Sequence, residues 1–200
     1  MKLLLSVLLF FLPFILFATT FYISPNGNDL NGNGSINNPW HSLFKATSTV
    51  TNPGSIIHIM AGTYIETSRS ILAPEVSIEG EGISSVIQST LTEEFVAIII
   101  ATSSEGTDGN QHISNLKLDG NKQTTSWGIE IRGRKNFSIH DCVIIDFEDR
   151  GVLWGGRNDN EEISPSIYAT GNSFYNNTVN NCAKYTDYGR GCLNIGGQEG

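Results

Sequence analysis

The sequence predicts an all-β chain whose short strands stack in parallel as a solenoid, with one short helix near the start. After residue 54 the chain carries a series of short runs, up to eleven residues long, that are rich in Ile and Val and are bounded by Gly, Asn or Asp. Two sets of these runs repeat along the chain. Gly and Asn, which both weaken helices, are abundant, whereas charged residues make up only 16% of the chain.

The first residues are typical of an export signal. Lys2 precedes an apolar run of fifteen residues, 3–17, and Ala18 offers a small residue for cleavage. A membrane span needs about 20 residues, so this run fits the apolar region of a secretory signal better. We therefore expect a signal peptide over 1–18 and a secreted or cell-surface protein, with an uncleaved anchor as the alternative.

Charge narrows the choice of partner. The net charge is −8, so the chain has no electrostatic reason to bind nucleic acid or, after signal cleavage, an anionic membrane surface. An acidic polysaccharide would also be repelled unless a cation or a local basic patch intervened. The chain is long enough for one domain with a sizeable core, and its oligomeric state is left open.

The Asn- and Gly-rich stretch after the signal contains part of a calcium motif. Asp29, Asn31, Asn33 and Gly34 match the start of an EF-hand loop. That loop needs a bidentate Glu at its twelfth position, where this chain has Trp40. A Trp side chain has no oxygen ligand, so an EF-hand is excluded.

One segment predicts a helix. Ser42 is a possible N-cap, and apolar residues then recur at i, i+3 and i+7 from Leu43 to Val50, before an Asn-Pro-Gly stop. We therefore divide the mature chain into an N-terminal segment with a capping helix, 19–54, and a region of strands, 55–200.

The strands follow one another after the helix. In chain order the predicted strands are Ser55–Met60, Val76–Gly82, Ser85–Ser89, Phe95–Ser103, His112–Asn121, Trp127–Gly133, Phe137–Phe147 and Gly151–Gly156. Such spacing is compatible with a sandwich, a barrel or a solenoid, so the repeats have to distinguish these folds.

The repeats favour the solenoid. The first set superimposes on Gly128, Gly151 and Gly191, and the second set on Asn115, Asp141 and Asn177. The members of the first set are 23 and then 40 residues apart, and those of the second set are 26 and then 36 residues apart. A single polar insertion, 157–170, explains the longer spacing in both sets. A period in the low twenties indicates a parallel β-solenoid, because stacking buries apolar strand faces that a single repeat leaves exposed.

Three motifs between residues 22 and 64 form a known signature. The matching residues are Tyr22, Ile23, Ser24, Gly27 and Asp29, then Asn38, Pro39, Trp40, Ser42, Leu43 and Ala46, then Pro53, Gly54, Ile57, Gly62, Thr63 and Tyr64. This pattern resembles the N-terminal signature of secreted right-handed parallel β-helix proteins of the pectate-lyase-like superfamily, with Ser55 where that family usually has Asp. The resemblance implies a right-handed parallel β-helix in which 42–50 is the helix that caps the N-terminal end.

The resemblance also implies activity on carbohydrate. Relatives cleave acidic polysaccharides as lyases or hydrolases, and many of the lyases use calcium and a Lys or Arg base. The short motifs of polygalacturonase-type hydrolases and of the best-known pectate lyases are absent from this sequence. We expect lyase chemistry on a pectin-, alginate- or glycosaminoglycan-type polymer, with calcium as the possible cofactor. A glycoside hydrolase is less favoured, and the alternative is a non-catalytic β-helix adhesin or carbohydrate-binding surface scaffold.

Candidate site residues come from two charged stretches and one insertion. The catalytic candidates are Glu130, Arg132 and Arg150, the substrate-binding candidates are Arg134, Lys135 and Arg157, and the candidates for a calcium site are Asp146, Glu148 and Asp149. Strand alternation from Ile129 to Arg132 places Glu130 and Arg132 on the outward side. A lyase needs a cation to neutralise a uronate and a base to remove its proton, which these residue types supply. A plain exposed strand and a solvated turn remain the alternatives.

Histidine and cysteine residues give weaker signals. His58 is expected to point outward, and His140 is expected to bond in a turn. Export permits a disulfide, and Cys182 with Cys192 would close a short loop, but buried thiols, Cys142 among them, are the favoured interpretation. No cysteine spacing matches a zinc site.

The sequence stops inside what reads as a further repeat. We therefore expect these 200 residues to be the N-terminal part of a longer protein. In the relatives the catalytic residues usually lie in middle repeats, at or beyond this point.

Overall fold

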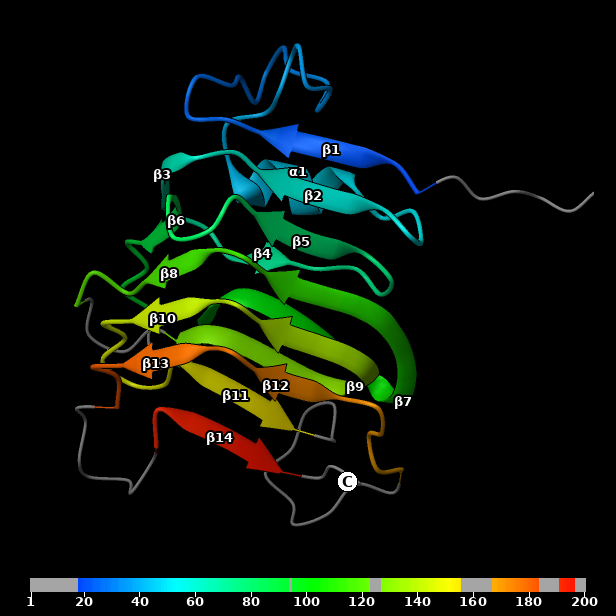
Figure 1. Ribbon diagram of the computed structural model, residues 1–200, viewed down its shortest axis with the longest axis vertical. Coiled ribbons are helices and arrows are strands. Elements are labelled where there is room, and N and C mark those ends of the chain that lie inside the picture. The colour runs from blue at the N-terminus through cyan, green and yellow to red at the C-terminus, as the bar shows by residue number, and fades with distance from the viewer. Residues whose placement is uncertain (1–17, 94, 123–126, 156–166, 184–190, 197–200) are drawn as a thin grey trace, which may run out of the picture.

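The described part of the chain folds into two β-sheets in which every pairing between named strands is parallel (Figure 1). The computed structural model describes residues 18–93, 95–122, 127–155, 167–183 and 191–196. The larger sheet contains β1 (Thr20–Ile23), β2 (Ile56–Ile59), β4 (Ser70–Ile71), β5 (Ser77–Gly80), β7 (Ala97–Ser114), β9 (Trp127–His140), β11 (Val152–Gly155), β12 (Ser173–Tyr175) and β14 (Leu193–Gly196). The smaller sheet contains β3 (Gly62–Glu66), β6 (Ser85–Ser89), β8 (Lys117–Asp119), β10 (Val143–Ile145) and β13 (Thr178–Asn180).

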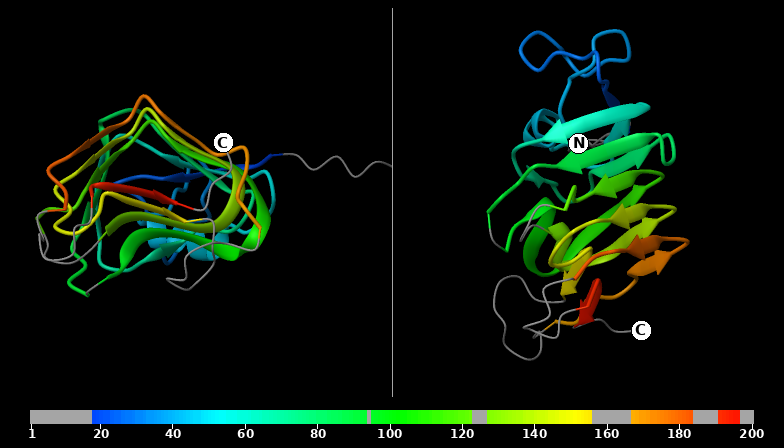
Figure 2. Two further views of the ribbon diagram at one scale, coloured as in Figure 1. Left: turned by 90° about the horizontal axis from the view of Figure 1, so that it is seen from below. Right: turned by 90° about the vertical axis from the view of Figure 1, so that its left-hand side faces the viewer.

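The chain passes repeatedly from the larger sheet to the smaller one. It does so from β2 to β3, β5 to β6, β7 to β8, β9 to β10 and β12 to β13. Each strand then pairs with a strand of an adjacent passage, so both sheets grow along one axis and the strands surround a shared interior (Figure 2).

Two long strands, β7 and β9, bend the larger sheet. Their first halves pair with β4 and β11, and their last residues pair with β5 and β12. The pairing between them shifts register after Thr102 and again after Asp108. Gly106 and Gly133 both have positive φ in this bend, a backbone conformation that glycine adopts at no steric cost.

Apolar residues at alternate positions form the core. Ile57, Ile78, Ile113 and Ile139 lie in register on adjacent strands, and all four are fully buried. Because strand side chains alternate between faces, the residues on either side of each Ile lie on the outer face of the sheet. The predicted all-β class with parallel strands is thereby confirmed.

The predicted helix is confirmed as α1 (Leu43–Thr49). The Ser42 side chain accepts a hydrogen bond from the Lys45 amide at 3.0 Å, as an N-cap does. The Asp29 carboxylate accepts from the Ser42 amide at 3.0 Å and from its hydroxyl at 2.7 Å. This acidic residue of the incomplete calcium motif therefore holds the start of the helix.

The repeats align as predicted except at their last members. In the first set the residue level with Gly151 is Cys192, where we expected Gly191. In the second set the residue level with Asp141 is Asn176, where we expected Asn177. Asn115, Asp141 and Asn176 have φ of 55°, 56° and 55°, so the shared feature of the turn is a left-handed residue, which Asn and Asp tolerate.

Three cysteines are present as thiols, with Cys142 and Cys182 buried and Cys192 half-buried. The expected signal peptide, 1–18, lies outside the described residues except for Ala18. In the described part of the chain, no helix has the length and apolar character to cross a membrane.

Candidate functional site

The predicted pair Glu130 and Arg132 lies on the outer side of β9. Ile129 and Ile131 beside them are fully buried, as alternation requires. Arg132 Nε donates to Glu130 Oε1 at 2.5 Å, and both side chains keep a fraction of their surface exposed. Gly155 on β11 is level with Arg132, so the position beside Arg132 on that strand carries no side chain.

Arg134, a predicted substrate-binding residue, lies in the interior and not on the surface where a sugar would bind. Only 1% of Arg134 is exposed, and its guanidinium donates to Ser103 Oγ at 2.9 Å, Gln111 Oε1 at 2.9 Å and the Leu72 carbonyl at 2.7 Å. Burial lowers the pKa of Arg134 to about 10, which still leaves it charged at neutral pH. Gly133 explains the error, because its φ of +71° breaks the alternation and turns the next side chain inward.

The other substrate-binding candidates differ in their surroundings. Lys135 lies on the surface, where its Nζ is 3.4 Å from Asp108 Oδ1. An exposed pair of this kind contributes little to stability. Arg157 lies outside the described residues.

Arg150, the third catalytic candidate, packs on an aromatic ring. Its guanidinium carbon is 4.6 Å from the centre of the Trp127 ring, and the side chain is largely buried. The Trp127 indole donates to Asp149 Oδ2 at 2.5 Å. Arg150 and Asp149 therefore hold Trp127 at the start of β9, apart from the pair on the outer face.

The calcium candidates are engaged with other residues. Asp149 binds Trp127, as above, and Asp146 accepts a hydrogen bond from the Asn181 side chain. Within the described residues, no group of three or more His, Cys, Asp and Glu side chains is arranged to hold a metal ion. Calcium binding stays a prediction for the residues Asp146, Glu148 and Asp149.

A further set of polar and aromatic side chains lies on the outer face of the larger sheet. Adjacent strands place the following residues level with one another: Tyr22, His58, Glu79, Ser114, His140 and Tyr175. His112 lies two residues before Ser114 on the same face. We name these seven residues the imidazole row, and the strands that carry it lie one below another in Figure 1.

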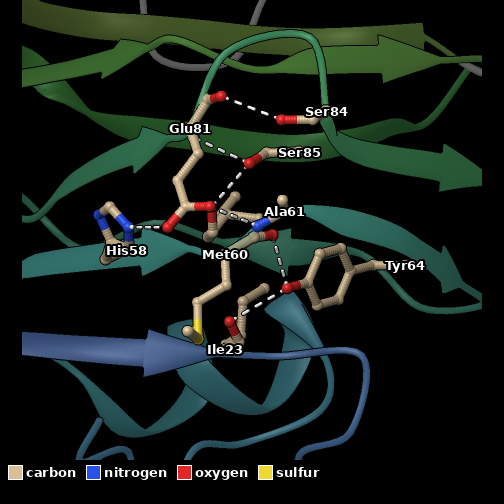
Figure 3. Close-up of polar contacts among 9 residues, drawn as sticks. Ile23, His58, Met60, Ala61, Tyr64, Glu81, Ser84 and Ser85 are labelled. Atoms are coloured by element: carbon tan, nitrogen blue, oxygen red, sulfur yellow. Dashed lines mark hydrogen bonds and ion pairs between the residues drawn. The ribbon is translucent and has the colours of Figure 1, made fainter.

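One end of the imidazole row is centred on His58. Its ring lies 5.4 Å from the Tyr22 ring. Its Nε2 is 3.2 Å from Glu81 Oε1, as Figure 3 shows. Glu81 also accepts from the Ala61 amide at 2.9 Å. The bond from this amide and then the bond from His58 hold the pKa of Glu81 below its ordinary value. Glu81 is therefore an ionised, fixed acceptor at neutral pH.

The other end of the imidazole row is a stack of rings. The ring centres of His112 and His140 are 5.8 Å apart, and His140 stacks on Tyr175 at 4.8 Å with an angle of 6° between the planes. Each histidine has a carboxylate partner: His112 Nε2 is 2.7 Å from Glu79, and His140 Nδ1 is 2.8 Å from Asp141. These bonds fix the rings and leave the Tyr175 side chain exposed at the end of the stack.

Sequence reasoning found His58 and His140 separately and missed the row. The prediction of a turn hydrogen bond for His140 is confirmed by its bond to Asp141, and the outward position of His58 is confirmed. Aligning the repeat on Asn177 in place of Asn176 hid that Tyr175 is level with His140. The signal that could have found the row is the recurrence of a buried Ile or Phe flanked by polar or aromatic residues.

Comparisons with known proteins leave the function open. No family model and no curated protein matches the chain. Among solved structures, it is similar to "Geobacillus virus E2 - ORF18" with a TM-score of 0.48 and 18% identity. The match covers 65% of this chain and 26% of that protein, and a likeness of this size carries no argument. The resemblance to the pectate-lyase-like superfamily stays a prediction.

Proposed function

We propose that the chain is an exported right-handed parallel β-helix protein that binds a polysaccharide along the outer face of its larger sheet. Parallel pairing throughout the named strands and repeated passage between two sheets support this fold. The Asn/Gly-rich start and the capped helix α1 agree with the β-helix signature. The apolar N-terminal run supports export.

The imidazole row is the observation that carries the proposal. Exposed aromatic rings offer flat apolar area to the C–H face of a sugar, and their polar edges can bind hydroxyl groups. Tyr175 supplies an exposed ring at the end of its stack with His140 and His112, and Glu79 and Asp141 add fixed acceptors beside the stack. A repeating polymer suits this row, because its strands recur along one axis.

Binding can be tested with a panel of pectins, alginate and glycosaminoglycans, each with calcium and with chelator. We expect at least one polymer to bind, and we expect the double variant His140→Ala/Tyr175→Ala to raise its Kd at least tenfold, about 1.4 kcal/mol. Lys117→Ala, on β8 of the smaller sheet, is the matched surface control and should leave the Kd unchanged. Binding that both variants retain would place the polymer elsewhere on the chain.

Cleavage by lyase chemistry is a second candidate, favoured by the pair on β9. Arg132 could neutralise a uronate carboxylate, and the level position on β11, Gly155, carries no side chain. Glu130, bonded to Arg132, would position that guanidinium. A Lys or Arg base, as used by relatives, is not identified among the described residues.

The lyase candidate is tested by following the absorbance of unsaturated product on the same panel. We expect calcium-dependent absorbance on one polymer, and a loss of at least tenfold in kcat/KM in Arg132→Ala. A flat trace on every polymer, together with clear binding to one of them, would leave the protein as a carbohydrate-binding scaffold.

A further inference from the structure

Two of the three cysteines lie next to each other at the end of the described chain. Cys192 Sγ donates to the carbonyl oxygen of Cys182 at 3.1 Å, although nine residues separate the two in sequence. We propose that Cys182 and Cys192 form a disulfide that ties β14 to the preceding passage of the chain. The proposal does not depend on polysaccharide binding.

The backbone holds both cysteines in place. The Cys192 carbonyl accepts from the Gly151 amide at 2.9 Å and from the Val152 amide at 3.0 Å. Cys182 Sγ donates to the Asn180 carbonyl at 3.2 Å. A sulfur–sulfur bond requires both thiols to leave these carbonyl oxygens and turn toward each other.

Gly151 borders both cysteines. A Cβ atom at this position would lie 3.3 Å from Cys182 Sγ and 3.1 Å from the Cys192 carbonyl oxygen. Because glycine has no side chain, both cysteines can pack against it. The third cysteine, Cys142, is 1% exposed and donates instead to the His140 carbonyl at 3.2 Å.

The bond would form by thiol–disulfide exchange with a small disulfide such as oxidised glutathione. The half-buried Cys192, as thiolate, attacks one sulfur of the oxidant and releases one glutathione thiol. Cys182 Sγ then loses its proton to solvent and displaces the second glutathione thiol. Two protein thiols are oxidised, and one glutathione disulfide is reduced to two thiols.

In the folded protein, the environment of Cys182 limits the rate of the second step, in which Cys182 attacks the mixed disulfide. Burial raises the pKa of Cys182 to about 11, so its thiol is almost fully protonated at neutral pH. The thiolate is the attacking species. Ring closure in the folded protein should therefore accelerate as the pH rises from 7 to 9, and it should be faster during refolding, before burial is complete.

The purified chain can be incubated with oxidised glutathione, both folded at pH 8.5 and during refolding. Remaining thiols are alkylated under denaturing conditions, and tryptic peptides are analysed by mass spectrometry. Trypsin cuts after Lys184 and Arg190, so Cys182 and Cys192 fall in different peptides, and Cys142 falls in a third. We expect a Cys182–Cys192 linked peptide that disappears on reduction, with Cys142 alkylated.

Thermal unfolding gives a second measurement on the same samples. The oxidised chain should melt about 5 °C higher than the reduced chain, and a reductant should abolish the difference. Cys142→Ser should still form the link, and Cys192→Ser should not. The proposal is overturned if no linked peptide forms under either condition, or if the link involves Cys142. Mapping the unaltered chain keeps the test valid even if a variant fails to fold.

Discussion

The interior cluster around Arg134 and the imidazole row lie at the two sides of one strand, β9, and differ in what their polar groups contact. Each of the three guanidinium nitrogens of Arg134 donates a hydrogen bond to the protein. In the row, His140 bonds to Asp141 through one nitrogen, and the neighbouring Tyr175 is exposed. Residues of similar polarity are thus structural on one side of the strand and available on the other.

The largest effect should come from removing the interior cation. Arg134→Ala leaves the buried acceptors of Gln111 and Leu72 without this donor, so we expect a loss of about 3–5 kcal/mol in the free energy of unfolding. Arg132→Ala is the matched control on the outer face and should cost about 1 kcal/mol or less. Urea denaturation measures both variants, and equal losses would erase the distinction between the two arginines.

A smaller effect is expected at the residue that turns Arg134 inward. In Gly133→Ala the new Cβ would lie 2.3 Å from the Ser103 carbonyl oxygen at a φ of +71°, so we expect a loss of about 2–3 kcal/mol. Gly82→Ala is the control, because Gly82 also has positive φ, +84°, and has nothing within 4 Å. It should cost about 1 kcal/mol. A Gly133 variant no less stable than the Gly82 variant would show that the bend is adaptable.

Glu66 and Glu81 should contribute to the free energy of unfolding with opposite dependence on pH. Burial raises the pKa of Glu66 above its ordinary 4.5, despite the hydrogen bonds from the Leu43 and Phe44 amides. Its contribution to stability is therefore full below pH 4.5 and is lost as the pH rises through the raised pKa. The pKa of Glu81 is lowered, so its contribution is present above pH 4.5 and is lost as the pH falls.

The measurement is the free energy of unfolding as a function of pH in Glu66→Gln and Glu81→Gln. In the unaltered chain, Glu66 should lower the stability as the pH rises above 4.5, and Glu81 should lower it as the pH falls below 4.5. Glu66→Gln should abolish the first decrease, and Glu81→Gln should abolish the second. Changes of the same sign in both variants would contradict the assignment.

The smallest effect is expected at Lys135. Its Nζ and Asp108 form an exposed pair at 3.4 Å, so Lys135→Ala should change the free energy of unfolding by no more than about 0.5 kcal/mol. Thermal melts at low and high salt test this. A loss above 1 kcal/mol would mean that surface charge stabilises the bend.

The sequence predicted those features that follow from local pattern. The capped helix from Ser42 and the strands β2, β5 and β6 were predicted within two residues at each end. The long strands β7 and β9 were not, because each joins two runs that were predicted as separate strands. The bend was not, because alternation from Ile129 through Arg132 gives no warning that Gly133 adopts positive φ. Glycine is compatible with both conformations, so only the contacts of the folded chain decide which one it adopts.

The candidate site was predicted less well, for a related reason. Glu130 and Arg132 are neighbours in one strand, so alternation was sufficient to pair them. The imidazole row joins six strands, and its members come together only if the register between distant segments is known. An error of one residue at Asn177 separated Tyr175 from His140.

Parallel pairing also has a consequence for how the chain acquires its structure. The closest partners among the named strands, such as Ile56 and Ser77, are 21 residues apart in sequence, and β11 pairs with β14 across 41 residues. No two named strands can therefore form a hairpin while the chain is being made. A strand must wait for a later segment to emerge before it is paired, so we expect folding on a timescale of milliseconds to seconds or longer.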